Sequence, residues 1–345
     1  MKKTILIGRI NKDHLPIGGE TAKNQMLIKV FGQHCDIIGI DFYRNKQRPW
    51  VFLQALWVLV RYPEASIILS TSAANIYPLL KIFKFFGIKR NIIHWVIGGE
   101  FDKLVQAGRF DVKILNVAKW HLAQSIDMVR NLKECGLKEV RYIPNFRQVP
   151  EISPQKGTAE NGAVKFVFMS RIMPEKGVRE ILECVKILNA KSYKERFSVD
   201  FYGPIDDSIR KEYENTISIT PNVQYKGILN LQDNGGYDVL ASYQAMLFPT
   251  FHPSEGIAGA IVDAFIAGVP VITTDWRHNR EVVTDNKTGI IVPAHDTGRL
   301  CEVMEDIICG KINLDAMSEN ARNEAENYKA ENIINNDFLK ELEIL

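Results

Sequence analysis

Short, nearly continuous apolar runs alternate with helix-like segments along most of this 345-residue chain. The predicted strands include residues 4–10, 66–70, 91–97, 164–169 and 223–225. Strands buried on both faces are typical of parallel sheets whose connecting helices cover both sides. The alternation therefore predicts an α/β fold, in which ligands bind at the carboxyl ends of the strands.

Length and charge both indicate two domains. A chain of this size is long for a single hydrophobic core. Residues 1–155 carry 23 Lys/Arg and 12 Asp/Glu, whereas the remainder carries 20 and 29. A Pro-, Gly- and Ser-rich segment without apolar periodicity follows the first strand series. We expect a first domain at 1–150, a linker at 151–163, a second domain at 164–325 and a C-terminal helix at 326–345.

Residues 253–275, PSEGIAGAIVDAFIAGVPVITTD, predict a loop, a helix over 257–267 and a buried strand. Ser254 is a candidate N-cap, and Gly256 and Gly259 keep side chains away from the first turn. The N–H groups there have no intrahelical partners, and the helix dipole favours negative charge. Such a helix start suits an anion.

Two carboxylates belong to this stretch. Glu255 and Asp263 lie eight residues apart, about 12 Å along a helix at ~1.5 Å per residue. They are therefore too distant for one acid/base pair, but they can contact opposite ends of an extended ligand. The alternative is a buried crossover helix with an exposed Asp263.

A second cluster, SRIMPEKG, directly follows the predicted strand at 164–169. Arg171 and Lys176 can converge there on one diphosphate, because Arg offers a bidentate fork and Lys a point charge. The alternative is a solvated ion pair between Lys176 and Glu175.

The first half offers weaker signals. Gly18 and Gly19 separate a strand from a helix, which suits either a phosphate or a plain tight turn. The residues Gly98, Gly99 and Glu100 end a predicted strand at 91–97 and lie at a candidate site edge. His94, inside that strand, is interpreted as a core histidine.

The motif Glu255-x7-Asp263 followed by AFIAGVPVI resembles the retaining GT-B glycosyltransferases of family 4 (group 1), of the bacterial surface-polysaccharide type. The second acid is usually Glu in that family, so Asp263 is a departure. The resemblance extends weakly over the first domain and strongly over 164–293.

The resemblance implies two Rossmann-like domains that face each other across a cleft, with the donor in the second domain and the acceptor in the first. Arg171 and Lys176 would grip the diphosphate, Asp263 would bond the ribose, and Glu255 would orient the sugar. The catalytic candidates are Glu255, Arg171 and Lys176. The donor-binding candidates are Gly18, Gly19, Arg171, Lys176, Gly203, Gly227, Glu255, Gly256, Ile257, Ala258 and Asp263. The acceptor-side candidates are Gly98, Gly99 and Glu100.

The resemblance implies transfer of a hexose-type sugar from a nucleotide-diphosphate sugar to a glycan or lipid-linked acceptor. No D-x-D motif occurs, so we expect neither a catalytic metal nor a cofactor. Two alternatives remain open. A sugar-nucleotide epimerase of the same fold needs additional acid/base carboxylates and a buried histidine. An inactive glycan-binding relative would lack the diphosphate cations.

Location and partners follow from composition. The five cysteines are scattered without C-x-x-C, which favours a reducing cytoplasm. No run of ~18 apolar residues exists, so no membrane span is expected. Basic and aromatic residues interleave at 44–62 and 81–90, which suits an anionic membrane surface. The resemblance implies that this surface is the inner face of the plasma membrane, because such enzymes often act on lipid-linked glycans there; no nucleic-acid partner is expected. The alternative is that these aromatics pack under the sheet.

Overall fold

A computed structural model describes residues 3–12, 14, 18–149, 162–231 and 235–345. The chain divides into two compact units, one comprising residues 1–148 and 329–345 and the other residues 149–328. Each unit is built on one six-stranded sheet, and all strand pairings are parallel. The predicted α/β class is therefore confirmed. Most of the expected linker, 151–163, lies outside the described residues.

The first sheet has the strand order β2-β1-β3-β4-β5-β6. Its strands are β1 (Lys3–Gly8), β2 (Asp36–Asp41), β3 (Ser66–Ser70), β4 (Ile92–Trp95), β5 (Trp120–Ala123) and β6 (Val140–Tyr142). The helices of this unit are α1 (Gly19–Phe31), α2 (Trp50–Arg61), α3 (Ala73–Phe85), α4 (Phe101–Gln106), α5 (Val112–Leu115), α6 (Ile126–Glu134), α14 (Ala330–Ile333) and α15 (Asn336–Glu341).

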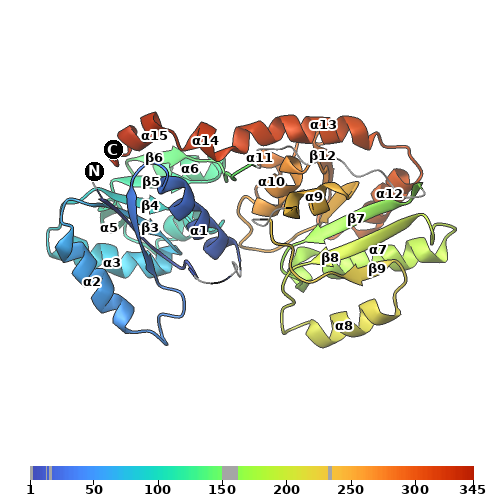
Figure 1. The fold of residues 1–345 in the computed structure, drawn as a ribbon, viewed down its shortest axis with the longest axis horizontal. Helices are drawn as coiled ribbons and strands as arrows, with labels where there is room; N and C mark the ends of the chain where they lie inside the picture. The colour runs from blue at the N-terminus through green and yellow to red at the C-terminus, as the bar shows by residue number, and fades with distance from the viewer. Residues whose placement is uncertain (1–2, 13, 15–17, 150–161, 232–234) are drawn as a thin grey trace. The chain divides into compact units, whose positions relative to one another are not determined.

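Helices cover both faces of the first sheet, as the apolar strands require. On one face, α2 to α6 pack on alternate strand residues such as Ile67 and Leu69. On the other face, α1 and the C-terminal segment pack on Ile68 and Trp95 (Figure 1). The tail, expected as one helix over 326–345, is broken into short helices. From residue 329 onward it completes the core of the first unit.

The second sheet has the strand order β12-β11-β10-β7-β8-β9. Its strands are β7 (Val164–Met169), β8 (Phe197–Tyr202), β9 (Val223–Tyr225), β10 (Ala245–Phe248), β11 (Val271–Thr274) and β12 (Gly289–Val292). Its helices are α7 (Val178–Ala190), α8 (Arg210–Ile219), α9 (Gly236–Ala241), α10 (Gly259–Ile266), α11 (Asn279–Val282), α12 (Thr297–Ile308) and α13 (Leu314–Ala325), with 3-10 turns η2 (Pro174–Lys176) and η3 (Glu326–Tyr328).

The second sheet is also covered on both faces. Helices α7, α8 and α12 pack on one side around Phe166, Phe168 and Phe201. Helices α9, α10 and α13 pack on the other side around Val167, Met246 and Phe248 (Figure 1). None of the described helices is long and apolar enough to cross a membrane.

Candidate functional site

The strand order of the second sheet identifies where a ligand would bind. The chain proceeds outward from β7 through β8 to β9, then returns to place β10 on the other side of β7. The loops that leave β7 and β10 therefore run in opposite directions from neighbouring strand ends. A crevice at such a reversal, outside the carboxyl ends of the strands, is the usual ligand site of open parallel sheets.

Backbone contact brings these loops together. Gly177, which begins α7, has a φ of 76°, and a Cβ atom there would lie 2.3 Å from the carbonyl oxygen of Pro249. The amide of Phe251 donates to the carbonyl oxygen of Glu175 at 2.8 Å. The loop after β7 is thereby held against the loop after β10.

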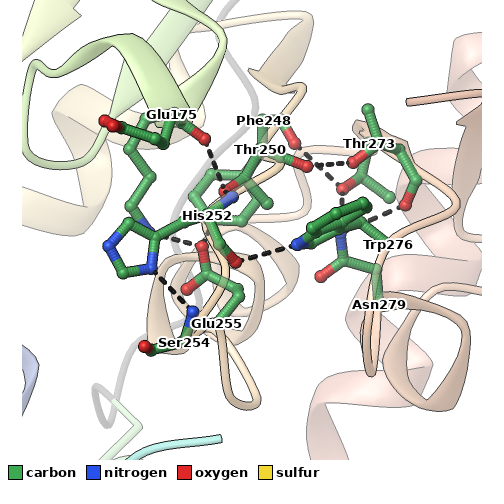
Figure 2. A network of polar contacts seen from close by, with 11 residues as sticks. Glu175, Phe248, Thr250, His252, Ser254, Glu255, Thr273, Trp276 and Asn279 are labelled. Carbon is green, nitrogen blue, oxygen red and sulfur yellow. Dashed lines mark hydrogen bonds and ion pairs between the residues drawn. The ribbon is translucent and has the colours of Figure 1, made fainter. Parts of the chain in front are cut away.

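A buried charge pair occupies this junction. The ammonium of Lys176 pairs with Oε2 of Glu255, and only about a tenth of each side chain is exposed, 12% and 10%. The hydroxyl of Thr250 donates to the same oxygen at 2.7 Å (Figure 2). Lys176 therefore pairs with Glu255, and its predicted alternative pairing with Glu175 is wrong. An ammonium has three donors, so this pair does not exhaust Lys176.

His252 lies beside this pair. Burial lowers the pKa of its imidazole, and the positive charge of Lys176 lowers it further. Its Nδ1 lies 3.2 Å from the amide of Ser254, which donates to it (Figure 2). A neutral ring that accepts at Nδ1 carries its proton on Nε2. The indole of Trp276 donates to the carbonyl oxygen of His252 at 2.8 Å, which ties this loop to the end of β11.

The end of β11 is supported in turn by a buried amide. Asn279 donates to the hydroxyl of Thr273 at 2.9 Å and to the carbonyl oxygen of Thr274 at 3.1 Å (Figure 2). Thr273 donates to the carbonyl oxygen of Phe248 at 2.9 Å. These bonds connect the ends of β10 and β11 and hold the loop that carries Glu255.

The helix after that loop begins later than predicted. Helix α10 starts at Gly259, its N-cap is Ala258, and no side chain caps it. Ser254 is exposed and is not the cap. Ile257 and Ala258 are buried in the core that the helix itself contacts, so the loop is fixed by packing. The 12 Å separation of Glu255 and Asp263 does not apply, because residues 255–258 are not helical.

Asp263 lies inside α10 and is buried. The hydroxyl of Tyr237, on α9, donates to its Oδ1 at 2.9 Å. This interaction means that Asp263 has a structural partner within the second unit. It is not the exposed acid of the crossover-helix alternative.

The remaining donor candidates lie at neighbouring strand ends. Arg171 is exposed directly after β7. The pKa of Asp206 is lowered mainly by the hydroxyl of Ser208, and the charge of Arg171 also contributes.

Gly203, after β8, has a φ of 138°, and a Cβ there would lie 1.8 Å from the carbonyl oxygen of Ser170. The carbonyl oxygen of Gly227, after β9, accepts a hydrogen bond from the amide of Gly203 at 2.8 Å. Gly256 lies with Ile257 and Ala258 in the loop before α10.

The other candidates belong to the first unit. Gly18 is the N-cap of α1 and Gly19 is its first residue. Gly98 and Gly99 follow β4 at the carboxyl edge of the first sheet, and Glu100 is the N-cap of α4.

The prediction that His94 is a core histidine is confirmed. Its side chain is fully buried on β4, and its Nδ1 lies 3.0 Å from Nδ1 of His121 on β5.

Several residues of this site were not found from the sequence. Thr250 and His252 occupy the loop after a predicted strand, so their position at a strand end was a usable signal. No sequence signal identified Tyr237 or Asn279. The partner of Tyr237 is distant in sequence, and the partner of Asn279 lies at the end of another element.

Comparison with known proteins places this geometry in a class. The crystal structure of Anabaena HepE in complex with UDP and glucose is similar over 100% of both chains, with a TM-score of 0.71 and 14% sequence identity. Sucrose-phosphate synthase from Thermosynechococcus elongatus is similar over 96% of both chains, with a TM-score of 0.72 and 13% identity. The fold is that of the GT-B glycosyltransferases.

Sequence comparison agrees with this fold. Residues 163–309 match the family model described as glycosyl transferases group 1. The capsular polysaccharide biosynthesis glycosyltransferase CapM of Staphylococcus aureus is 26% identical over 51% of this chain and 47% of its own. A GDP-mannose-dependent phosphatidylinositol monomannoside mannosyltransferase of Mycobacterium tuberculosis is 23% identical over 54% of this chain and 49% of its own. These alignments span about half the length of each curated relative.

Proposed function

We propose that the protein is a retaining glycosyltransferase that moves a sugar from a nucleotide-diphosphate sugar to a glycan or lipid-linked acceptor in polysaccharide synthesis. The observation that carries the proposal is the Lys176–Glu255 pair at the β7/β10 reversal. Lys176, together with the exposed Arg171, offers positive charge where a departing diphosphate develops negative charge. CapM is named a capsular polysaccharide biosynthesis glycosyltransferase and the HepE crystal structure contains UDP and glucose, and both support this proposal.

The site residues take distinct roles in this proposal. Oε2 of Glu255 is held by Lys176 and Thr250, which leaves Oε1 to accept a hydroxyl of the donor sugar. Asp263 would accept a ribose hydroxyl. The N–H groups at the start of α10 would face phosphate oxygens. On the first unit, the edges at Gly18–Gly19 and Gly98–Glu100 would approach donor and acceptor.

The proposed reaction needs no group from outside the two substrates. The acceptor oxygen forms a bond to the anomeric carbon on the face from which the diphosphate departs. The bond from that carbon to the phosphate oxygen breaks, and the acceptor proton moves to the leaving phosphate. No carboxylate in the described part of the site is assigned as a covalent nucleophile. The proposal also places no metal in this step.

A donor screen tests the proposal. Nucleoside diphosphates and their sugars are added singly, and the melting temperature is measured, because a ligand that binds the folded state raises it. We expect one nucleotide to stabilise the protein and its sugar to be transferred with the anomeric configuration retained. Activity should survive EDTA. Loss with EDTA and recovery with manganese or magnesium would contradict the metal-independent step.

The same screen separates the alternatives. Conversion of the sugar nucleotide without an acceptor would identify an epimerase. Stabilisation by glycans but by no nucleotide would identify an inactive glycan-binding relative. The proposed location is the cytoplasm, at the inner face of the plasma membrane, where lipid-linked acceptors would be met.

A further inference from the structure

Helix α2 of the first unit is almost wholly apolar, and Gln54 and Arg61 are its polar residues. Val51, Ala55 and Val58 face the core. The opposite side is open, and large apolar side chains on it are 55% to 72% exposed: Trp50, Phe52, Leu53, Leu56, Trp57 and Val60. A helix on the surface of a water-soluble domain normally carries polar residues there. A contiguous apolar face of this kind marks an interaction site.

The end of α3 extends this apolar face. Ile82, Phe85 and Phe86 are 50%, 83% and 69% exposed. Both helices pack on the same face of the first sheet (Figure 1). Arg90, just after α3, donates to the carbonyl oxygens of Leu59 at 3.1 Å and Tyr62 at 2.5 Å, at the end of α2. We refer to the exposed residues of α2 and of 81–86 as the α2–α3 surface.

Cations predominate around the α2–α3 surface, although the exposed Glu64 lies beside Lys89 and Arg90. Residues 42–62 and 73–90 contain eight Lys/Arg and no Asp/Glu. The exposed ones include Arg44 and Lys46 before α2, and Lys81, Lys84 and Lys89 on and after α3. Arg90 has a structural role, because its guanidinium is bonded to backbone carbonyls. An apolar and aromatic face bordered by cations matches the chemistry of an anionic lipid interface.

We infer that the α2–α3 surface binds an anionic membrane leaflet. Helix α2 has 12 residues, about 18 Å at ~1.5 Å per residue, and cannot cross a hydrocarbon core of ~30 Å. It lies along the interface, with Leu53, Trp57 and Val60 at the acyl chains and the cations at the headgroups. The inference rests on the proposed location at the plasma membrane, and it is independent of the transfer chemistry.

A second copy of the chain fits this surface less well. In a symmetric dimer the same patch faces itself. The cations at the border of the two patches would then lie close together, with Glu64 as a nearby acidic residue but with a net excess of positive charge. Like charges across an interface oppose association. Anionic lipids compensate the same cations.

The surface also has a favourable position for the proposed reaction. The loop that leads into α2 follows β2 at the carboxyl edge of the first sheet. The acceptor-side candidates Gly98, Gly99 and Glu100 follow β4 at the same edge. A membrane bound to α2 would therefore present a lipid-linked acceptor near that edge.

The test is sedimentation of the full chain with phosphatidylcholine vesicles, with and without phosphatidylglycerol. We expect binding to the anionic vesicles at low salt, and release at high salt because the attraction is screened within about 10 Å at 0.1 M. Leu53→Glu combined with Trp57→Glu should reduce the bound fraction by about tenfold or more. Ile219→Glu is the matched control, because Ile219 is 80% exposed on α8 of the other unit.

Further measurements keep the inference falsifiable. Replacing Lys81, Lys84 and Lys89 by Glu should remove the preference for anionic vesicles, and Arg90 is left intact to preserve the fold. Quenching of tryptophan fluorescence by brominated lipid should accompany binding and be lost when Trp50 and Trp57 are both replaced by Phe. Equal recovery of the wild type in the supernatant with both vesicle types would overturn the inference.

Two outcomes distinguish this inference from the proposed function. If the wild type is instead a dimer that Leu53→Glu/Trp57→Glu converts to a monomer, a second copy covers the surface and the membrane inference is wrong. Nucleotide binding, measured on the same samples, should be the same in all variants. Loss of vesicle binding with intact nucleotide binding therefore affects only the membrane inference, whereas absence of nucleotide binding with intact vesicle binding affects only the proposed transferase activity.

Discussion

Both units bury ionisable side chains, but they do so at different places in their sheets. In the first unit, His94 and His121 face each other on β4 and β5, in the middle of the sheet and without solvent exposure. In the second unit, Lys176 and Glu255 lie in loops beyond the strand ends and keep about a tenth of their side chains exposed. The first pair is sealed within a core, whereas the second keeps some contact with solvent.

The contrast shows how the same architecture separates structure from chemistry. A polar group inside a parallel sheet is surrounded by apolar neighbours, so the core favours its neutral form. A polar group at the carboxyl edge lies on a loop that a rigid sheet positions but does not cover. Strand position therefore predicts which buried charges are candidates for function.

The largest expected effect concerns the glycines at the two sheet edges. Gly203→Ala should destabilise the second unit by roughly 3–5 kcal/mol, because the new Cβ would lie 1.8 Å from the carbonyl oxygen of Ser170. Gly98→Ala is the matched variant in the first unit. Its φ is also positive but no atom lies within 4 Å, so we expect only about 1–2 kcal/mol. Urea unfolding measures both, and equal losses would mean that the two edges are equally constrained.

The next effect concerns the pH dependence of stability, which we attribute to the buried His94–His121 pair. Burial lowers the pKa of His121 from 6.5 to about 4. Below pH 6.5 the unfolded chain takes up a proton that folded His121 does not, so stability is lost as pH falls toward about 4. The loss should approach 3 kcal/mol, at about 1.4 kcal/mol per pKa unit.

Unfolding of the wild type across this pH range measures that loss. Burial and the neighbouring His121 also lower the pKa of His94, so the double variant His94→Leu/His121→Leu should flatten the pH dependence most. His14→Leu, an exposed control, should leave it unchanged. A double variant with the wild-type slope would show that other groups carry the acid sensitivity.

A smaller effect, on nucleotide affinity, is expected at Lys176 of the Lys176–Glu255 pair and at Arg171. Arg171→Ala and Lys176→Ala should each weaken nucleoside-diphosphate binding by about 1.5–3 kcal/mol, the range for hydrogen bonds to charged groups. Calorimetry on variants with a normal unfolding transition measures this loss. Lys211→Ala, at an exposed position on α8, controls for general charge. Unchanged affinity in both site variants would remove the cations from the donor site.

The smallest effect distinguishes ligand binding from structure at Asp263. Tyr237→Phe removes one buried hydrogen bond and should cost about 1 kcal/mol of stability while leaving nucleotide affinity nearly intact. Asp263→Ala should lose affinity as well. If Asp263→Ala melts much lower but binds normally, its carboxylate serves only Tyr237 and the fold.

Local sequence patterns identified most of the framework. The strands at 66–70, 164–169 and 223–225 have the predicted boundaries, because an apolar run flanked by polar residues is a local signal. The helices α4, α8, α9, α11 and α12 were not predicted. Helix α8 has a single buried residue, Tyr213, so its apolar periodicity is weak.

The chemical identity of the site residues was likewise readable in the linear sequence. Glu255 was selected because it precedes a predicted helix start, in a motif that resembles the glycosyltransferase family. Arg171 and Lys176 were selected because cations that closely follow a buried strand must lie near a sheet edge. That argument depends only on strand direction, which the alternation of strands and helices determines.

Only the tertiary structure decided what these residues contact. Lys176 pairs with a carboxylate 79 residues away rather than with its neighbour Glu175, because the reversal at β7 and β10 brings their loops together. Helix α10 begins at Gly259 rather than next to Ser254, since burial of Ile257 and Ala258 outweighs a local cap. The exposure of Trp57 on α2 is likewise decided by tertiary packing. Periodicity shows that a helix is apolar, but only packing shows which side the core covers.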